Sequence, residues 1–437
     1  MATHRTADLS TANTRFDGGA GRVTTVATAA AVVGLGLSAA LVFFGSVDVG
    51  RFGKVWMHNF LFILSLALGG LFFVIIQHLA RAGWSVAVRR VAEAMASNLR
   101  WMWLLFLPIV VLWMTGKLGA VYPWADIELI RTINPAEAHL VEAKTAYLNP
   151  TFFFIRAAIY FAVWFALGTY FWRLSVRQDS AVDAASAAAT TSRFQRMSAP
   201  AIMLFGLTTT FAAFDWIMSL NPAWFSTIFG IYFFAGSCCG GFAAMIVILT
   251  LLRRQGKLEG IVTPEHFQDL GKLLFGFGIV FWAYIGYSQY MLIWYANLPE
   301  TTGWFHARQL GGWKWVSVAL IFGHFLVPFV LFISRHPKRI PATALFVAVW
   351  MLAIHWIDLY WLIMPEIPHD LGQMKSHAEL IARHGETTTG LLDPLNWTTL
   401  LGMLGLFVAF TNQALRAHAL IPIHDPRLHE SLAFENM

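Results

Sequence analysis

Residues 56–80 read WMHNFLFILSLALGGLFFVIIQHLA, a run of 25 positions with no Lys, Arg, Asp or Glu. A helix needs about 20 mostly apolar residues to cross the hydrocarbon core of a bilayer, so this run predicts a transmembrane helix. Further apolar runs lie at 23–45, 99–116, 152–174, 199–220, 226–252, 271–296, 313–334, 341–363 and 397–415. The sequence therefore predicts an all-α polytopic membrane protein with about ten transmembrane helices.

Composition supports this class. Of 437 residues, 57% are hydrophobic and only 12% are charged, whereas a soluble domain has about 25% charged residues. The net charge is +6. In a membrane protein the distribution of basic residues along the chain is informative, so we do not interpret this charge as a sign of nucleic-acid binding. No phosphate-binding glycine loop is present, which argues against an ATP-driven pump.

The distribution of basic residues predicts the topology. If Met1 is inside, 20 of the 30 Lys and Arg residues fall in inner segments and 10 in outer segments. The positive-inside rule then places both termini in the cytoplasm. The predicted tails are 1–22 and 416–437, and the longest polar outer loops are 117–150 and 364–395. Within the first loop, 135–146 is expected to form a short surface helix.

A weak internal repeat is visible. Gly69-Gly70 and Gly240-Gly241 occupy similar places in two runs that cross in the same direction. Asp215-Trp216-Ile217 and His355-Trp356-Ile357 end two later runs in a similar way. We expect two parallel four-helix bundles, since repeats about an axis along the membrane normal are a known design. The predicted bundles are 56–220 and 226–363, flanked by helices 23–45 and 397–415.

Ionisable side chains occur inside these apolar runs, near one membrane face. Asp215 is one; His355 and Asp358 are three positions apart and so share a helix face. An ionisable group in hydrocarbon costs at least ~2.5 kcal/mol and is a functional-site hypothesis by default. The run 271–296 is expected to contribute Tyr284, Gln289 and Tyr290. The pattern predicts a proton path or quinone-adjacent cavity. The alternative is that these groups satisfy one another's hydrogen bonds or lie in the polar headgroup zone of the membrane.

His324 lies near the centre of its run, four residues before Pro328. Proline frees a backbone carbonyl within a helix, so His324 is either a central proton relay or a neutral imidazole bonded to a carbonyl. On the inner side, His78 and Arg81 are candidates for a cytoplasmic proton entry. The basic segment 81–98 is interpreted as an interfacial amphipathic helix, or as ordinary positive-inside anchoring.

No cofactor bound covalently or through metal ligands is expected. Cys238 and Cys239 are adjacent and cannot supply a four-cysteine cluster or a haem-attachment motif. His324 and His355 lie on neighbouring helices at different expected depths, which is unsuited to paired haem ligation.

Several stretches together resemble the NrfD-like membrane subunits, and within them the F subunits of bacterial alternative complex III. They are Asn59-Phe60-Leu61-Phe62, Gly83-Trp84-Ser85, Arg89-Arg90-Val91-Ala92-Glu93, Phe214–Leu220 and Trp224-Phe225-Ser226-Thr227. The resemblance covers about residues 50–415. It implies ten helices with two four-helix bundles, in a bacterial cytoplasmic (inner) membrane.

The resemblance also implies a function. It places the chain in a quinol:cytochrome c-type oxidoreductase complex, where it contributes scaffold, a quinone-adjacent cavity and a proton path. The implied partners are a second NrfD-like membrane subunit, a periplasmic iron–sulfur subunit, c-type cytochrome subunits and lipids, and the implied ligand is menaquinone or ubiquinone. A secondary transporter with parallel repeats, or a purely structural membrane anchor, is the alternative.

Overall fold

The computed structural model describes residues 7–45, 47–133, 135–368 and 377–436, and all the regular secondary structure in them is helical. Ten helical runs in these residues are long and apolar enough to cross a membrane, so the chain is an all-α polytopic membrane protein. They are α2 (Ala20–Phe44), α3 (Val49–Leu79), the run Gly83–Met114 with α4 (Val86–Ala96) and α5 (Met102–Met114), α8 (Pro150–Gln178), the run Ala184–Leu220 that begins with α9 (Ala184–Trp216), α10 (Phe229–Arg254), the run Pro264–Ala296 with α11 (Pro264–Leu273) and α12 (Trp282–Ala296), the run Trp313–Ile333 with α14 (Trp313–Leu320) and α15 (Val327–Ile333), α17 (Pro341–Ile363) and α19 (Pro394–Ala417).

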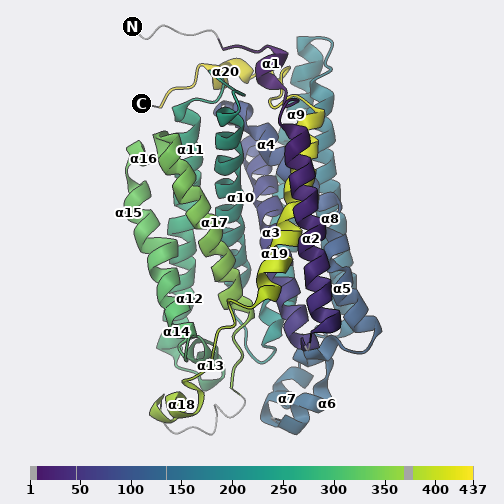
Figure 1. Cartoon of the computed structure of the whole chain (residues 1–437), viewed down its shortest axis with the longest axis vertical. Coiled ribbons are helices and arrows are strands. Elements are labelled where there is room, and N and C mark those ends of the chain that lie inside the picture. Colours follow the sequence, from purple (N-terminus) through teal and green to yellow (C-terminus); the bar gives the residue numbers. More distant parts are fainter. Residues whose placement is uncertain (1–6, 46, 134, 369–376, 437) are drawn as a thin grey trace.

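Short helices cover the two ends of the molecule (Figure 1). We call the end that carries the first and last helices of the chain the terminal end, and the opposite end the distal end. The terminal end carries α1 (Thr11–Thr14), α16 (Arg335–Arg339) and α20 (Leu428–Leu432). The distal end carries α6 (Ile127–Ile133), α7 (Pro135–Glu142), α13 (Pro299–Ala307) and α18 (His377–His384). Helix α7 confirms the surface helix predicted within 135–146. Residues 1–6 of the predicted tail and 369–376 of the predicted loop lie outside the described residues.

Local sequence sets where the long helices begin. Asn149 accepts a hydrogen bond from the Phe152 N–H ahead of Pro150, and Asp393 accepts one from the Leu395 N–H ahead of Pro394. A polar cap followed by proline at the first helical position satisfies one orphan N–H and presets the backbone.

The two glycine pairs bring the central helices into contact. A Cβ on Gly241 would lie 2.6 Å from Gly69 Cα, and a Cβ on Gly69 would lie 2.7 Å from Gly241 Cα. Helices α3 and α10 therefore touch backbone to backbone, and both are largely buried. Residues without a side chain at this contact allow the two backbones to approach this closely, and the first glycine of one pair meets the second glycine of the other.

The other crossing helices pack around this central pair, and α9 contacts both of its members. Helix α3 packs with α4 and α9, and α9 packs with α8, whereas α10 packs with α17 and with the segment between α11 and α12. Helices α2 and α19 pack together along their length and join the first group through α3. Figure 1 shows them side by side, purple and yellow. We call the group of α3, α4, α5, α8 and α9 the first unit, and α10 to α17 the second unit.

The prediction of an interfacial helix at the membrane surface over 81–98 is wrong. Every residue of α4 is buried, and the crossing run begins at Gly83 rather than at the predicted 99. The basic residues that suggested a surface location are neutralised inside the protein. Arg89 pairs with Glu93 and Asp425, and Arg90 pairs with Asp179.

Candidate functional site

The candidate site is built around Asp358, a carboxylate buried in the second unit. Tyr232 of α10 donates its hydroxyl to Asp358 Oδ1 at 2.6 Å, and Trp282 of α12 donates its indole N–H to Oδ2 at 3.1 Å. Both donors are neutral, and no Lys or Arg of the described chain forms an ion pair with this carboxylate. An acid held by neutral donors in a low-dielectric interior is suited to gaining and losing a proton.

His324 extends the site from Trp282 towards α15. Its imidazole stacks on the Trp282 indole, with ring centroids 3.7 Å apart and planes 10° apart. Its Nε2 lies 3.2 Å from the Gly278 carbonyl oxygen. Gly278 and His324 occupy π-helical segments, Leu274–Phe281 and Ile321–Leu326. Single π turns inside α-helices are uncommon and recur at functional sites.

Pro328 accounts for part of this geometry. In a π register the Gly323 carbonyl would accept from the residue five positions on, which is Pro328 and has no N–H. The Trp350 indole donates to that carbonyl instead, at 2.7 Å. As predicted, the proline leaves a carbonyl near His324 without a backbone N–H donor. The indole of Trp350 is the donor to that carbonyl instead.

His355 lies on the next turn of α17, against the glycine face of α10. A Cβ on Gly236 would lie 2.8 Å from His355 Cε1, and one on Gly240 would lie 3.1 Å from its Cδ2. These glycines therefore make the space that the imidazole fills. His355 Nε2 is 2.9 Å from Ser65 Oγ of α3, so it links the two units.

His58 of α3 completes a row of three buried histidines with His355 and His324. Its Nε2 is 2.9 Å from the Trp356 carbonyl oxygen. Trp356 directly follows His355 in α17, so this contact places His58 beside the turn that carries His355. The row therefore runs from the second unit to the central helix α3.

Hydrogen-bond partners fix the tautomers in this row. A carbonyl only accepts, so Nε2 of His58 and of His324 carries the hydrogen. Ser65 gives its own hydroxyl proton to the Phe62 carbonyl at 2.6 Å, so His355 Nε2 is also a donor. In each ring Nδ1 is then the acceptor, and all three Nδ1 atoms are buried without a partner in the described residues. Each ring is thus a neutral imidazole with one unused acceptor nitrogen.

Asp215 belongs to a different cluster, in the first unit. Arg156 of α8 grips it with two hydrogen bonds, Nε to Oδ2 at 2.7 Å and Nη2 to Oδ1 at 2.8 Å. The Tyr160 hydroxyl donates to Oδ2 at 2.7 Å, and the Tyr147 ring covers the guanidinium at 3.8 Å. Such a bidentate ion pair gives the carboxylate a fixed counter-charge. Asp215 is thus a structural anion, and no hydrogen bond joins it to Asp358.

The three expected contributors from 271–296 do not line one cavity. Tyr284 is 63% exposed and Tyr290 is 39% exposed, with the Tyr290 ring packed on Phe305. Their expected place beside Asp358 is wrong, because they lie on the outward face of α12. Gln289 is buried, but its Oε1 accepts a hydrogen bond from Ser226 at 3.5 Å rather than from the candidate site.

Arg308, which the sequence analysis did not single out, lies on the distal side of the site, directly after α13. It is 1% exposed, and its guanidinium donates to the carbonyls of Trp361 and Leu362 at the end of α17 and to that of Trp304. No carboxylate of the described residues pairs with it, and burial holds the pKa of Arg308 well below its usual value.

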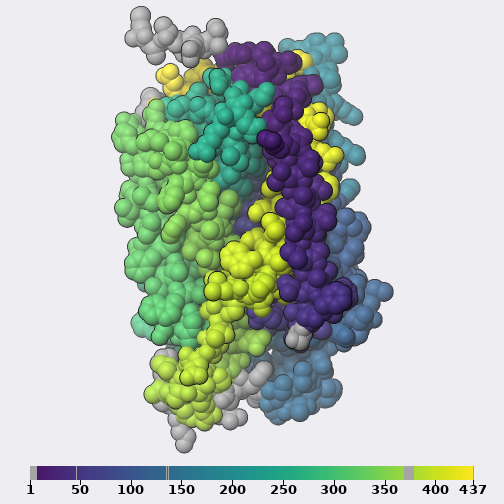
Figure 2. Space-filling view, in the orientation of Figure 1, coloured from purple at the N-terminus to yellow at the C-terminus, as the bar shows by residue number. Residues whose placement is uncertain are grey.

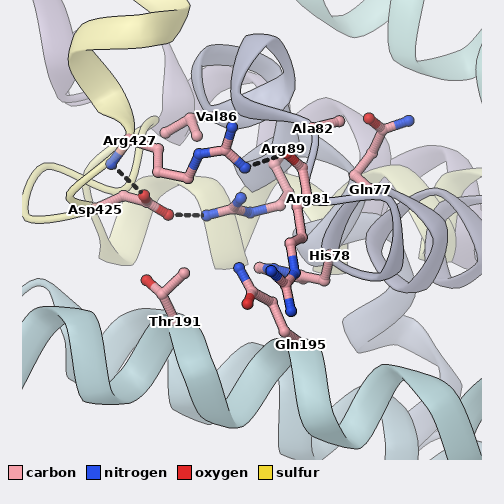
Figure 3. A pocket seen from close by; sticks show the side chains of 10 residues that line it. All are labelled: Gln77, His78, Arg81, Ala82, Val86, Arg89, Thr191, Gln195, Asp425 and Arg427. Atoms are coloured by element: carbon pink, nitrogen blue, oxygen red, sulfur yellow. Dashed lines mark hydrogen bonds and ion pairs between the residues drawn. The ribbon is translucent and has the colours of Figure 1, made fainter.

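The two candidates for an inner proton entry, His78 and Arg81, do share a pocket at the terminal end (Figure 3). Its cavity volume is about 10 Å³, room for about one water molecule. His78 stacks on Phe194 with ring centroids 4.2 Å apart, and its buried Nε2 has no partner in the described residues.

The chain's C-terminal segment closes this pocket. Arg81 has left-handed backbone, with φ of 52°, and its carbonyl accepts a hydrogen bond from Arg427. Asp425 accepts from the Arg427 backbone N–H at 2.9 Å and pairs with Arg89, as Figure 3 shows. The pairing of α4 with a segment more than 300 positions away gave no local sequence signal.

The described residues hold no group of three or more His, Cys, Asp or Glu side chains placed to bind a metal ion. Cys238 and Cys239 are both buried free thiols. No protein-family model matches the chain, and no curated protein matches it either. The geometry of the site and the residues themselves therefore carry the functional argument.

Proposed function

We propose that this chain is an integral membrane subunit of a quinol:electron-acceptor oxidoreductase complex, and that its second unit exchanges protons beside a quinone cavity. The observation that carries the proposal is Asp358, a buried carboxylate with two neutral donors, at one end of a row of three histidines. Oxidation of a quinol releases a proton from each hydroxyl, and a positioned carboxylate or imidazole can accept it.

The resemblance to NrfD-like subunits supports the kind of complex. In this proposal the chain supplies scaffold, the cavity and the proton path. The electron-carrying centres belong to an iron–sulfur subunit and c-type cytochrome subunits, alongside a second NrfD-like membrane subunit. The quinone is menaquinone or ubiquinone. The membrane is the bacterial cytoplasmic membrane, with both termini in the cytoplasm, in agreement with the excess of Lys and Arg in the segments of the terminal end.

The test is Asp358→Asn in the assembled complex, with quinol oxidation and proton release measured together. Loss of a positioned general base lowers turnover by about 10²-fold or more, so we expect at least that loss with assembly intact. Tyr284→Phe is the matched control, because this exposed hydroxyl on α12 lies outside the site. Assembled Asp358→Asn complex with wild-type turnover and proton release would leave the chain a structural anchor.

One observation favours a second candidate, a secondary transporter. Two crossing runs are interrupted by π-helical segments that meet at His324 and Gly278, and transporters commonly build midplane sites from discontinuous helices. Co-purification separates the two. Stable association with c-type cytochromes supports the redox complex, whereas proton-coupled solute uptake by vesicles containing this chain alone supports the transporter.

A further inference from the structure

A second, larger pocket opens at the terminal end, between the end of α10 and the start of α17. Its volume is about 400 Å³. The lining residues are Thr250, Arg253, Arg254, Glu259, Gly260 and Pro341. In Figure 2 the teal end of α10 and the loop after it lie on the viewer's side, between the purple N-terminal segment and the green α16 and α17. The proposed proton site does not include any of these residues.

The wall formed by the loop is specifically held in place. Gly256, Leu258 and Gly260 all have left-handed backbone, with φ of 72°, 58° and 71°. This conformation is costly for a branched side chain such as Leu258 and persists only where the surroundings fix it. Asn13 fixes it: its amide donates to the Glu259 carbonyl at 2.9 Å and accepts from the Glu259 N–H at 2.8 Å. The pocket is thus a built feature of the fold.

The cations in the pocket lack anionic partners. Arg253 packs over the Phe267 ring at 5.6 Å, and its Nη1 is buried without a hydrogen-bond partner in the described residues. Neither Arg253 nor Arg254 forms an ion pair with a described carboxylate, including Glu259 of the same pocket. Guanidinium groups bind phosphate oxygens through paired hydrogen bonds.

Apolar side chains flank the same pocket. Leu251 is 46% exposed and Ile340 is 52% exposed, each directly beside lining residues in the sequence. A ligand with a charged head and apolar chains matches this juxtaposition better than a free anion does. Basic pockets between transmembrane helices are known to hold anionic lipid head groups.

We propose that this pocket binds a phosphate group through Arg253 and Arg254, and that the phosphate belongs to the head group of an anionic glycerophospholipid. The lipid's acyl chains lie along the exposed apolar surface of α10 and the start of α17. The proposal is independent of the redox function.

The experiment measures retention of phosphatidylglycerol by the purified full chain, using native mass spectrometry after addition of defined lipid. Phosphatidylcholine is the zwitterionic comparison, and inorganic phosphate is the soluble competitor. The test variant is Arg253→Gln with Arg254→Gln. The control is Arg335→Gln, which removes an exposed cation at the same end that does not line the pocket.

We expect wild type and the control to retain phosphatidylglycerol in preference to phosphatidylcholine. The double variant should lose about thirtyfold in affinity, equivalent to about 2 kcal/mol at 1.4 kcal/mol per tenfold, with each arginine contributing about half. Equal retention by wild type and the double variant overturns the site. Displacement by millimolar inorganic phosphate, without a preference for phosphatidylglycerol, overturns the lipid assignment. Unchanged circular dichroism of the variants shows that they are folded.

Discussion

The same substitution, aspartate to asparagine, should cost much more stability at Asp215 than at Asp358. At Asp215 the carboxylate receives three donors: Arg156 Nε and the Tyr160 hydroxyl on Oδ2, and Arg156 Nη2 on Oδ1. Asparagine has one acceptor oxygen, so its NH2 group would face a guanidinium N–H. Donor would meet donor, and a buried guanidinium would lose its counter-ion.

Breaking a buried ion pair by removing one partner costs about 3–5 kcal/mol. Asp215 is fully buried and the Arg156 side chain is only 7% exposed, so solvent cannot replace the lost charge. At Asp358 the amide fits: its oxygen accepts from the Trp282 indole, and its NH2 donates to the Tyr232 hydroxyl, which can rotate to accept. We therefore expect a loss under about 1 kcal/mol for Asp358→Asn.

The assay is thermal unfolding of the two purified variants in one detergent. At about 2 °C per kcal/mol, Asp215→Asn should melt about 6–10 °C below wild type and Asp358→Asn within about 2 °C of it. The reasoning is refuted if Asp215→Asn melts with wild type, or if both variants fall equally. Arg156→Met together with Asp215→Leu checks the mechanism: replacing both charges should recover part of the stability that the single variant loses.

Three further predictions concern packing, topology and pH. Gly241→Ala should cost about 1–3 kcal/mol of stability, because the added Cβ would meet the backbone of Gly69. Gly36→Ala should leave the melting temperature unchanged in the same assay, because no heavy atom lies within 4 Å of the added Cβ. A cysteine replacing Ser180, exposed at the terminal end, should resist a membrane-impermeant thiol reagent added to spheroplasts, while one replacing Thr145, exposed at the distal end, should react; the opposite pattern would invert the topology. Burial, and then the charge of Arg90, lower the pKa of His418 below 6.5. The folded state therefore binds fewer protons than the unfolded state near that pH, so the free energy of unfolding should fall on acidification through about 6.5. His418→Gln should flatten this dependence of stability on pH.

The number of helices could be predicted from sequence, because hydrocarbon allows only a backbone that satisfies its own hydrogen bonds. The start of the third crossing could not. Arg89, Arg90 and Glu93 made 81–98 look like a surface segment, but their counter-charges Asp425 and Asp179 are distant in sequence. The glycine pairs were predictable as contacts because small residues have few other uses at such positions; only the structure shows that they touch each other.

Depth along a helix follows from residue spacing, but the direction a side chain faces depends on its neighbours. Asp215 and Asp358 were expected to share a cavity because both lie near the distal end. The structure assigns them different partners, since Arg156 reaches Asp215 from α8 while only neutral donors reach Asp358. The outward direction of Tyr284 was equally hidden, because large apolar and aromatic residues occur on every side of the helix around it, and only the structure shows that Trp282, Ile285 and Gln289 form its buried face.

The pairing of charges also separates structural groups from groups that can do chemistry. An aspartate fixed by a guanidinium cannot accept a proton without breaking its ion pair, so Asp215 can hold α8 against α9 but is a poor relay. Asp358 loses no ion pair when it is protonated, and its neighbour Trp282 contacts His324 directly. The histidines after it each keep one unused acceptor nitrogen. In the proposed function, the proton path therefore runs from Asp358 through the histidines of the second unit to His58 of α3, and it leaves out the Asp215 cluster of α8 and α9.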